Sequence, residues 1–165
     1  VCNAGIVSNV PAEEMTDAIE FVVATAEPTG VAHALHACPL IGQVLTSTPN
    51  RFAAYLVGRK ILVDVRLVPS AAFVVTLVWR TGNDAHWRLL VEAAARRGFD
   101  LTPHALRRDT VNVPVTSEAE LYGLLGFAGV PAELRQGRGE LDAAAARRIP
   151  KLITEPDVLG CVHSH

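Results

Sequence analysis

The feature that most constrains this chain is a carboxylate inside a stretch that otherwise has the composition of a buried strand. Residues 61–68 are rich in β-branched and apolar side chains, which is typical of a β-strand. Alternation along the strand places Asp64 and Arg66 on one face and a row of apolar side chains on the other. Two interpretations remain open: a solvated face with a weak ion pair, or a carboxylate that faces a metal ion or a substrate.

An apolar segment and a glycine turn follow this strand. Residues 71–79 are almost entirely apolar, and we interpret them as a second, central strand. The polar turn TGND ends it, and a helix is predicted to begin there, with Thr81 or Asn83 as its N-cap and Asp84 in its first turn. The helix is predicted to end at Gly98 after two arginines. A glycine turn that leads into a helix N-terminus can bind a phosphate or a nucleotide sugar, although such turns are common.

The order of these parts resembles the palm of family X DNA polymerases, in particular the bacterial members that carry a C-terminal PHP domain. The resemblance rests on the VDVR strand, the apolar segment, a TGxxAH turn into a helix and the ARRGFDL segment. In that family the VDxR carboxylate is the third metal-binding acid of the nucleotidyl-transfer site, so the resemblance implies this role for Asp64. The family's YFTGS turn, which reads WRTGN here, binds the incoming nucleotide. The nucleotide-binding residues that this implies are Trp79, Arg80, Gly82, Asp84 and Trp87.

Two of these positions depart from the family pattern. Position 80 is aromatic in the family and is an arginine here. Position 87 is usually an asparagine that reaches the nucleotide's base, and here it is Trp87. An indole at this position removes that hydrogen bond and could fill the pocket, or it could simply pack the helix against its neighbours.

Two segments near the N-terminus correspond to other parts of the family's site. Gly5 lies where the family has a glycine–serine pair that grips the triphosphate, but the serine position is Ile6 here, or the serine has moved to Ser8. On the next strand the family has two aspartates that flank one apolar residue. Side chains at i and i+2 share a face, so two carboxylates can bridge metal ions about 3.5–4 Å apart. This chain has Ala18 and Glu20 there, which predicts impaired activity.

The coarse order of elements predicts an α/β (α+β) fold. Strands are predicted at 18–24, 40–45 and 52–57 and a helix at 31–38, all before the strand that carries Asp64. This order predicts a nucleotidyltransferase-type palm with a mixed β-sheet and helices, followed by a small α+β thumb subdomain. The predicted domains are a palm-like domain at 1–98, a thumb-like subdomain at 99–150, and a linker with the start of a truncated PHP domain at 151–165.

The last third of the chain carries weaker parts of the resemblance. Ser117 and Glu120 form a capping-box pattern that predicts the start of a helix. The segments PAELR and GEL resemble the end of the family's thumb. The terminal HSH resembles the first metal ligands of a PHP domain, but two histidines do not make a site. We therefore expect His163 and His165 to bind metal only in an intact PHP domain.

Composition limits the partners. The net charge of −2 is not typical of a protein that binds nucleic acid by bulk electrostatics, but the arginines occur in pairs that could follow a phosphate backbone or could be solvated helix caps. One such pair is Arg135 with Arg138, and the residues predicted to contact DNA are Arg66, Arg107 and Arg108. The three cysteines show no disulfide or zinc spacing. No apolar run has membrane-spanning length, so a cytoplasmic protein without a membrane partner is expected.

The sequence supports two hypotheses about function. The first hypothesis is a Mg²⁺- or Mn²⁺-dependent DNA nucleotidyltransferase of DNA repair, with Asp64 and Glu20 as metal ligands and DNA and dNTPs as partners. The second is a non-catalytic DNA- or nucleotide-binding scaffold that keeps the palm fold. Both ends of the chain are interpreted as cuts through a larger protein, and the predicted missing parts are an N-terminal DNA-binding domain and a C-terminal PHP domain.

Overall fold

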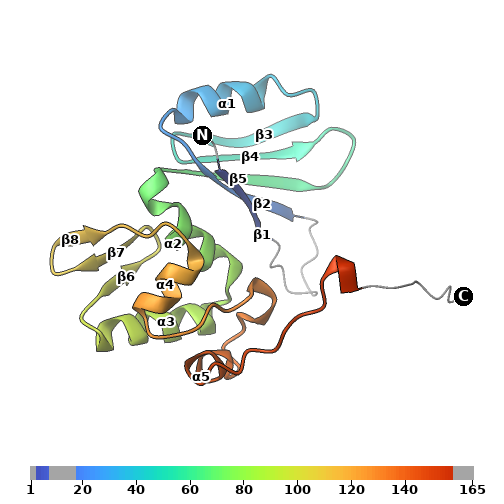
Figure 1. Ribbon diagram of the computed structural model, residues 1–165. Helices are drawn as coiled ribbons and strands as arrows, with labels where there is room; N and C mark the ends of the chain where they lie inside the picture. Colours follow the sequence, from blue (N-terminus) through green and yellow to red (C-terminus); the bar gives the residue numbers. More distant parts are fainter. Residues whose placement is uncertain (1–2, 8–17, 158–165) are drawn as a thin grey trace, which may run out of the picture.

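The computed structural model describes residues 3–7 and 18–157, and it places a five-stranded sheet above a second, mainly helical body (Figure 1). The sheet has the order β1-β2-β5-β4-β3. Its strands are β1 (Asn3–Val7), β2 (Ala18–Ala24), β3 (Ile41–Thr48), β4 (Arg51–Leu56) and β5 (Leu62–Val68). β2 and β5 run parallel and the other neighbours run antiparallel, which confirms the predicted mixed sheet.

The apolar face of β5 forms a core under the first helix. Val63, Val65 and Leu67 are all buried there, as alternation along the strand predicted. They pack with Phe52 of β4 and with side chains of α1 (Pro28–His36), which lies over the sheet in Figure 1. The opposite face carries Asp64, together with Val22 and Val68, which pack against Ala72.

Residues 71–79, which we predicted as a strand, form a helix instead, and the strand prediction is wrong. They belong to α2 (Ser70–Thr81), which is twelve residues long. One side of α2 packs on the sheet through Ala72, and other positions such as Val75 and Val78 pack into the second body. A helix that is covered on two sides is apolar nearly all round, so its composition imitates a central strand. The length of the run favours a helix, because buried strands usually have about four to eight residues.

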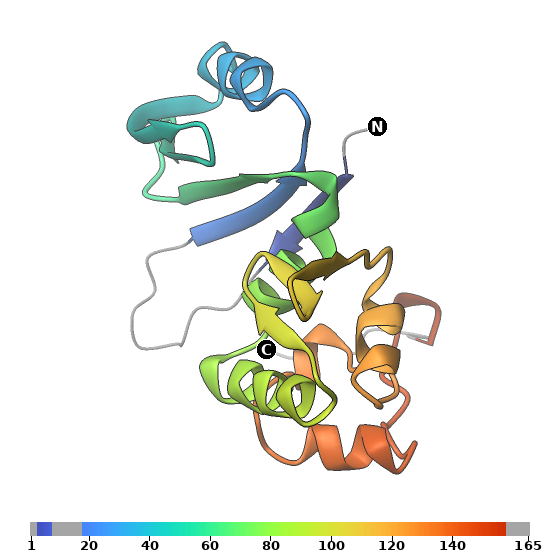
Figure 2. The same ribbon diagram turned by 90° about the vertical axis from the view of Figure 1, so that its left-hand side faces the viewer.

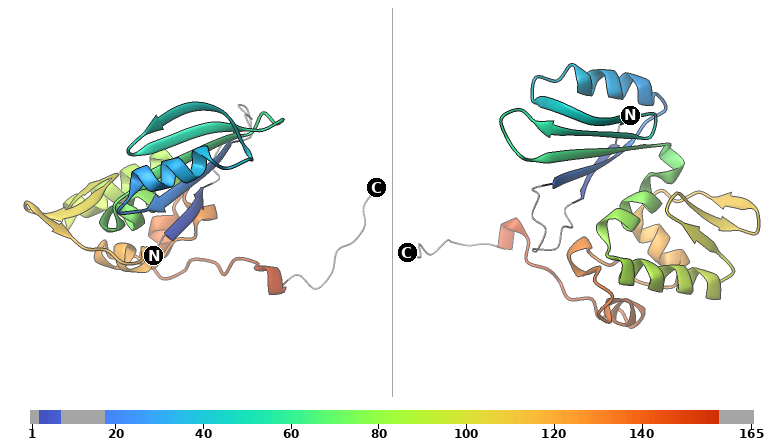
Figure 3. Two further views of the ribbon diagram at one scale, coloured as in Figure 1. Left: turned by 90° about the horizontal axis from the view of Figure 1, so that it is seen from above. Right: turned by 180° about the vertical axis from the view of Figure 1, so that it is seen from behind.

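The second body surrounds one apolar core, and Figure 2 and the right-hand view of Figure 3 show its helices and small sheet below the five-stranded sheet. It contains α3 (Asp84–Arg96), a three-stranded antiparallel sheet, α4 (Glu118–Leu124) and α5 (Glu140–Ala145). The small sheet is made of β6 (Asp100–Thr102), β7 (Ala105–Arg108) and β8 (Val111–Val113), and short 3-10 helices lie at Ala132–Leu134 and Glu155–Asp157. The predicted domain division after residue 98 stays a prediction, but this core groups α2 and α3 with the small sheet.

Two predicted helix caps can be compared with the structure. The side chain of Asn83 accepts a hydrogen bond from the backbone N–H of His86 at 2.9 Å, so Asn83 is the N-cap of α3. Ser117 accepts from the N–H of Glu120 at 3.1 Å, as the capping box predicted. The return bond differs, because the Glu120 carboxylate accepts from the N–H of Thr116 at 2.7 Å, one residue before the N-cap.

Candidate functional site

Glu20 and Asp64 lie side by side on neighbouring strands. Glu20 of β2 is the register partner of Asp64 of β5, and the same register pairs Ala18 with Leu62. Residues two apart on a strand share a face, so Ala18 and Glu20 present a methyl group and a carboxylate beside Asp64. The structure therefore brings two predicted metal-binding carboxylates together and leaves the third position apolar.

Arginine side chains hold both carboxylates. Arg51 of β4 donates from Nε to Asp64 Oδ1 at 3.1 Å and to Oδ2 at 3.2 Å, and from Nη2 to Oδ2 at 2.7 Å. Hydrogen bonding to Asp64 is the largest cause that raises the pKa of Arg51, and partial burial of Arg51 opposes it. Arg80, in the last turn of α2, donates from Nε to Glu20 Oε2 at 2.9 Å and also contacts it through Nη2. Each carboxylate is thus neutralised by a guanidinium that the sequence places far from it or on another strand.

These residues do not fit a pair of magnesium ions. Mg²⁺ requires a shell of oxygen ligands, and the oxygens of Asp64 already accept hydrogen bonds from Arg51. Arg66 adds a further positive charge, with its Nε 3.7 Å from Asp64 Oδ1. Within residues 18–157, no group of three His, Cys, Asp or Glu side chains could hold a metal ion. We call Glu20, Asp64, Arg51, Arg66 and Arg80 the arginine–carboxylate cluster, and its net charge is positive.

A hollow of about 630 Å³ opens beside Glu20, where the end of α2 and the start of α3 meet the segment 132–138. We call it the α2–α3 hollow. Its volume is in the range of small-molecule sites. The residues that line it are Glu20, Trp79, Arg80, Gly82, Asn83, Asp84, Ala132, Glu133, Arg135, Gln136 and Arg138. It gathers most of the side chains that the sequence predicted to bind a nucleotide, but neither Asp64 nor Trp87 lines it.

Two predicted nucleotide-binding residues have roles inside the fold. Trp87 is half-buried and packs against the core of the second body, so helix packing accounts for its position. Gly82 lies on the α2–α3 hollow, but a Cβ there would lie 2.9 Å from Cδ2 of His86. The close approach of His86 therefore requires a glycine at this position even without a ligand.

The arginines predicted to contact DNA lie in different parts of the molecule. Arg66 belongs to the large sheet, whereas Arg107 and Arg108 are exposed on β7 of the small sheet (Figure 1). The Nε of Arg107 donates to Oδ1 of Asn112 at 3.0 Å, and the guanidinium of Arg108 lies 4.2 Å from the ring centre of Phe99. Their contact with DNA stays a prediction.

The other predicted site residues belong to the N- and C-terminal segments. Gly5 lies on β1 opposite Val22, and Val22 is in turn the register partner of Arg66. Gly5, Val22 and Arg66 therefore lie at the same level on the three neighbouring strands β1, β2 and β5. Ser8, His163 and His165 lie outside the described residues.

Arg135 is a buried residue that sequence reasoning missed. We treated it with Arg138 as one of the surface pairs, but only Arg138 is exposed, and Arg135 is 2% exposed. Its Nε and Nη2 donate to the carbonyl of Val130 at 3.0 and 2.9 Å, and its Nη2 donates to Oε2 of Glu118 at 2.6 Å. It also contacts the hydroxyl of Thr81 at the end of α2. Nothing in the local sequence distinguishes Arg135 from Arg138.

A buried histidine connects α3 to α4 and α5. Nδ1 of His86 lies 2.6 Å from Oε1 of Glu140, and Nε2 lies 2.9 Å from the hydroxyl of Tyr122. Burial lowers the pKa of His86, although the Glu140 hydrogen bond opposes this. Burial alone would raise the pKa of Glu140, but hydrogen bonds from His86 and from the N–H groups of Gly137 and Arg138 lower it. We therefore assign a neutral His86 that donates from Nδ1 to an ionised Glu140.

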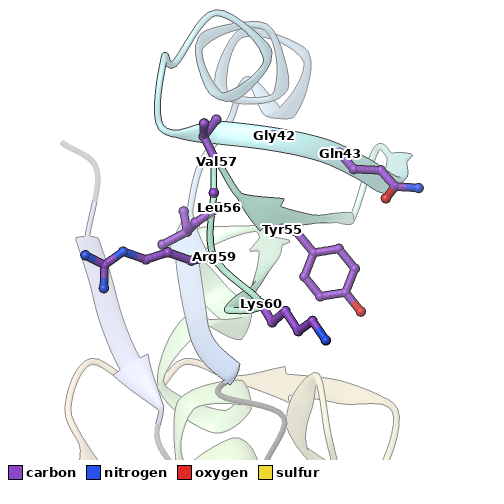
Figure 4. A pocket seen from close by; sticks show the side chains of 8 residues that line it. Gly42, Gln43, Tyr55, Leu56, Val57, Arg59 and Lys60 are labelled. Atoms are coloured by element: carbon purple, nitrogen blue, oxygen red, sulfur yellow. The ribbon is translucent and has the colours of Figure 1, made fainter.

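A second hollow, of about 650 Å³, lies at the far end of the β4–β5 hairpin (Figure 4). Tyr55 and Lys60 point to one side of it and Arg59 to the other. Its lining has no acidic or histidine side chain, and it shares no residue with the α2–α3 hollow. It therefore adds nothing to the predicted nucleotidyl-transfer chemistry.

Comparisons with known proteins agree with this arrangement. A family model described as DNA polymerase beta thumb matches residues 76–136, which include the second half of α2, all of α3 and the small sheet. This region is similar to the thumb of DNA polymerase beta. The DNA polymerase/3′-5′ exonuclease PolX of Bacillus subtilis (strain 168) is 26% identical to the chain over 157 residues. The predicted resemblance to family X DNA polymerases is confirmed.

The chain corresponds to only part of its relative. The alignment with the Bacillus protein covers 93% of this chain and 27% of that protein, so the chain spans about a quarter of its relative's length. The thumb match begins at residue 76, within the range predicted as palm-like. In the described parts of the chain, no helix is long and apolar enough to cross a membrane.

The loop that follows the thumb match provides a test of close packing. Gly137 has φ of +67°, and a Cβ there would lie 2.5 Å from the Cβ of Ala85 in α3. We expect Gly137→Ala to lower the free energy of unfolding by about 2 kcal/mol, measured by urea denaturation. Gly139→Ala is the matched control, because Gly139 also has a positive φ but open space around it. An equal loss in both variants would mean that backbone conformation alone accounts for the effect.

Proposed function

We propose that this chain is a DNA- and nucleotide-binding module with a family X palm and thumb, and that it does not itself perform nucleotidyl transfer. The observation that supports the proposal is the arginine–carboxylate cluster. Both carboxylates at the position of the predicted metal site are bound to guanidinium groups, and Ala18 takes the place of a third acid. The α2–α3 hollow supplies a site of nucleotide size next to this cluster.

The partners belong to the same proposal. DNA and dNTPs are the ligands that the resemblance implies, and DNA repair in the cytoplasm is the process and place that it implies. The predicted N-terminal DNA-binding domain and C-terminal PHP domain are further parts of the proposal.

A Mg²⁺- or Mn²⁺-dependent DNA nucleotidyltransferase is the second candidate. The register of Glu20 with Asp64 favours it, because adjacent strands can present two carboxylates to one metal ion. Metal ions in such sites neutralise the charge that develops on the transferred phosphoryl group. For this candidate, Arg51 and Arg80 would first have to leave the two carboxylates.

Primer extension and DNA binding, measured on the same preparation, separate the two candidates. We expect the chain to bind a gapped DNA duplex in fluorescence anisotropy. We also expect no primer extension above the level of an Asp64→Ala variant, with either Mg²⁺ or Mn²⁺. The reason is that loss of charge stabilisation at a reacting phosphoryl group costs a factor of about 100 or more in rate.

Two outcomes would contradict the proposal in different ways. Extension that disappears in Asp64→Ala would establish the nucleotidyltransferase. Absence of both extension and binding, in a chain whose circular dichroism spectrum shows that it is folded, would contradict any DNA-binding role.

A further inference from the structure

The arginine–carboxylate cluster contains one buried hydrogen-bond donor that has no acceptor. This donor is Nε of Arg66, the one buried side-chain nitrogen or oxygen without a hydrogen-bond partner among the described residues. Asp64 Oδ1 lies 3.7 Å away, beyond hydrogen-bond distance, and both oxygens of Asp64 accept from Arg51. A buried donor without an acceptor is costly, and native proteins usually supply a water, an ion or a ligand to it.

Two guanidinium groups flank this position. Arg66 and Arg51 are register partners on the antiparallel strands β5 and β4, so their side chains share a face with Asp64 between them. The side chain of Arg66 is 32% exposed and that of Arg51 is 39% exposed, so both can be reached from solvent. The side chain of Asp64 is only 8% exposed. A ligand that approaches this face therefore meets positive charge first.

We infer that this face binds a phosphate group directly through the guanidinium groups of Arg66 and Arg51, without a metal ion. The inference rests on the proposed nucleic-acid-binding function and specifies how the ligand is held. Guanidinium groups bind phosphate oxygens through paired, charge-assisted hydrogen bonds, and the partly exposed side chains of Arg66 and Arg51 can present such donors to a ligand. The phosphate could be a phosphodiester of DNA or part of a nucleotide's polyphosphate.

Charge explains why the ligand is an anion and not a cation. The cluster has three guanidinium groups and two carboxylates, so one positive charge is in excess. A divalent cation at Asp64 would have to displace Arg51 and remain beside Arg66, and like charges at such distances repel. A phosphate leaves the Arg51–Asp64 bonds in place and adds the missing negative charge.

The first test is anion binding in EDTA, where a site that depends on a metal ion does not bind the anion. Sodium tripolyphosphate, dATP and a gapped DNA duplex are titrated separately against the full chain by calorimetry or fluorescence. We expect Arg66→Gln to weaken binding about tenfold, the effect of one charge-assisted hydrogen bond. Arg59→Gln is the control, because it removes the same charge at the hollow of Figure 4 and should change affinity by no more than about twofold.

A second variant is expected to change the affinity in the opposite direction from the change at a metal site. Asp64→Asn removes the carboxylate that competes for the two arginines, so we expect it to strengthen tripolyphosphate binding about fivefold in EDTA. A metal-mediated site would show no binding in EDTA, and in Mg²⁺ the same substitution would abolish its binding. Thermal unfolding of each variant confirms that it is folded. If Arg66→Gln is not folded, Arg66→Lys, which retains the charge, replaces it.

Each outcome has one meaning. Loss of tripolyphosphate binding in Arg66→Gln identifies a polyphosphate as the ligand, and loss of DNA binding alone identifies a phosphodiester. DNA or dATP binding that requires Mg²⁺, or that Arg66→Gln leaves unchanged, would overturn the inference while the proposed function stands. Absence of binding to all three ligands would overturn both.

Discussion

The Arg135→Met variant is expected to lose about 3 kcal/mol of free energy of unfolding. Methionine fills part of the same volume but leaves the buried carbonyl of Val130 without its two donors and Glu118 without its partner. Removing one partner of a fully buried ion pair costs about 3–5 kcal/mol, but Glu118 is 37% exposed, so water solvates part of its freed charge. The expected loss is therefore near the lower limit.

Urea denaturation followed by circular dichroism measures this loss, and Arg138→Met is its matched control. Arg138 is three residues away, exposed, and uses only its backbone N–H in the bonds that we describe. We expect its substitution to change stability by less than about 0.5 kcal/mol. Arg135→Lys should not restore stability, because an ammonium group cannot reproduce the fork that reaches both acceptors. Equal losses at both positions would contradict the assignment of Arg135 as a buried link.

Acidification is expected to destabilise the second body in two steps. The pKa of His86 is lowered from 6.5, mainly by burial, so the unfolded chain binds this proton first and stability falls as the pH drops below about 6.5. The pKa of Glu140 is also lowered, from 4.5: burial alone would raise it, but the hydrogen bonds from His86 and from three backbone N–H groups prevail. Its contribution is present above about pH 4.5 and is lost as the pH falls below that value. Each group adds a slope of up to about 1.4 kcal/mol per pH unit.

Urea midpoints measured at intervals from pH 8 to pH 3.5 test this expectation. His86→Gln removes the upper step, because glutamine keeps hydrogen-bonding groups but does not titrate. Glu140→Gln should flatten the lower step, at a cost in stability at pH 7 because Gly137 and Arg138 lose a charged acceptor. A midpoint that stays constant between pH 7 and pH 5 in the unsubstituted chain would show that His86 is not held neutral by burial.

Much of the sheet could be predicted from local patterns. The strand predicted at 18–24 coincides with β2, and the predicted core face of β5 is buried. Strand propensity and side-chain alternation depend on neighbouring residues only, so one sequence suffices for them. The caps Asn83 and Ser117 are of the same kind, because a cap bonds to an N–H two or three residues away.

The segment of α2 was wrongly predicted as a strand because the residues that bury it are distant in sequence. Its apolar residues follow no single face, since the sheet covers one side and the core of the second body covers another. The spacing of apolar residues therefore shows only that the segment is buried, and not whether it is a helix or a strand. With α2 taken as a strand, Arg80 could not be placed at a helix end that faces Glu20.

The sequence by itself determined that this chain has a mixed sheet, capped helices and a carboxylate on each of two strands. Only the tertiary structure decided what those carboxylates bind. Arg80 reaches Glu20 across sixty residues of sequence, and Arg51 reaches Asp64 across thirteen. An isolated carboxylate can bind either a metal ion or an arginine, so its role depends on which partner folding brings within reach. The same holds for Arg135, which differs from Arg138 only in being enclosed by chain segments that are distant in sequence.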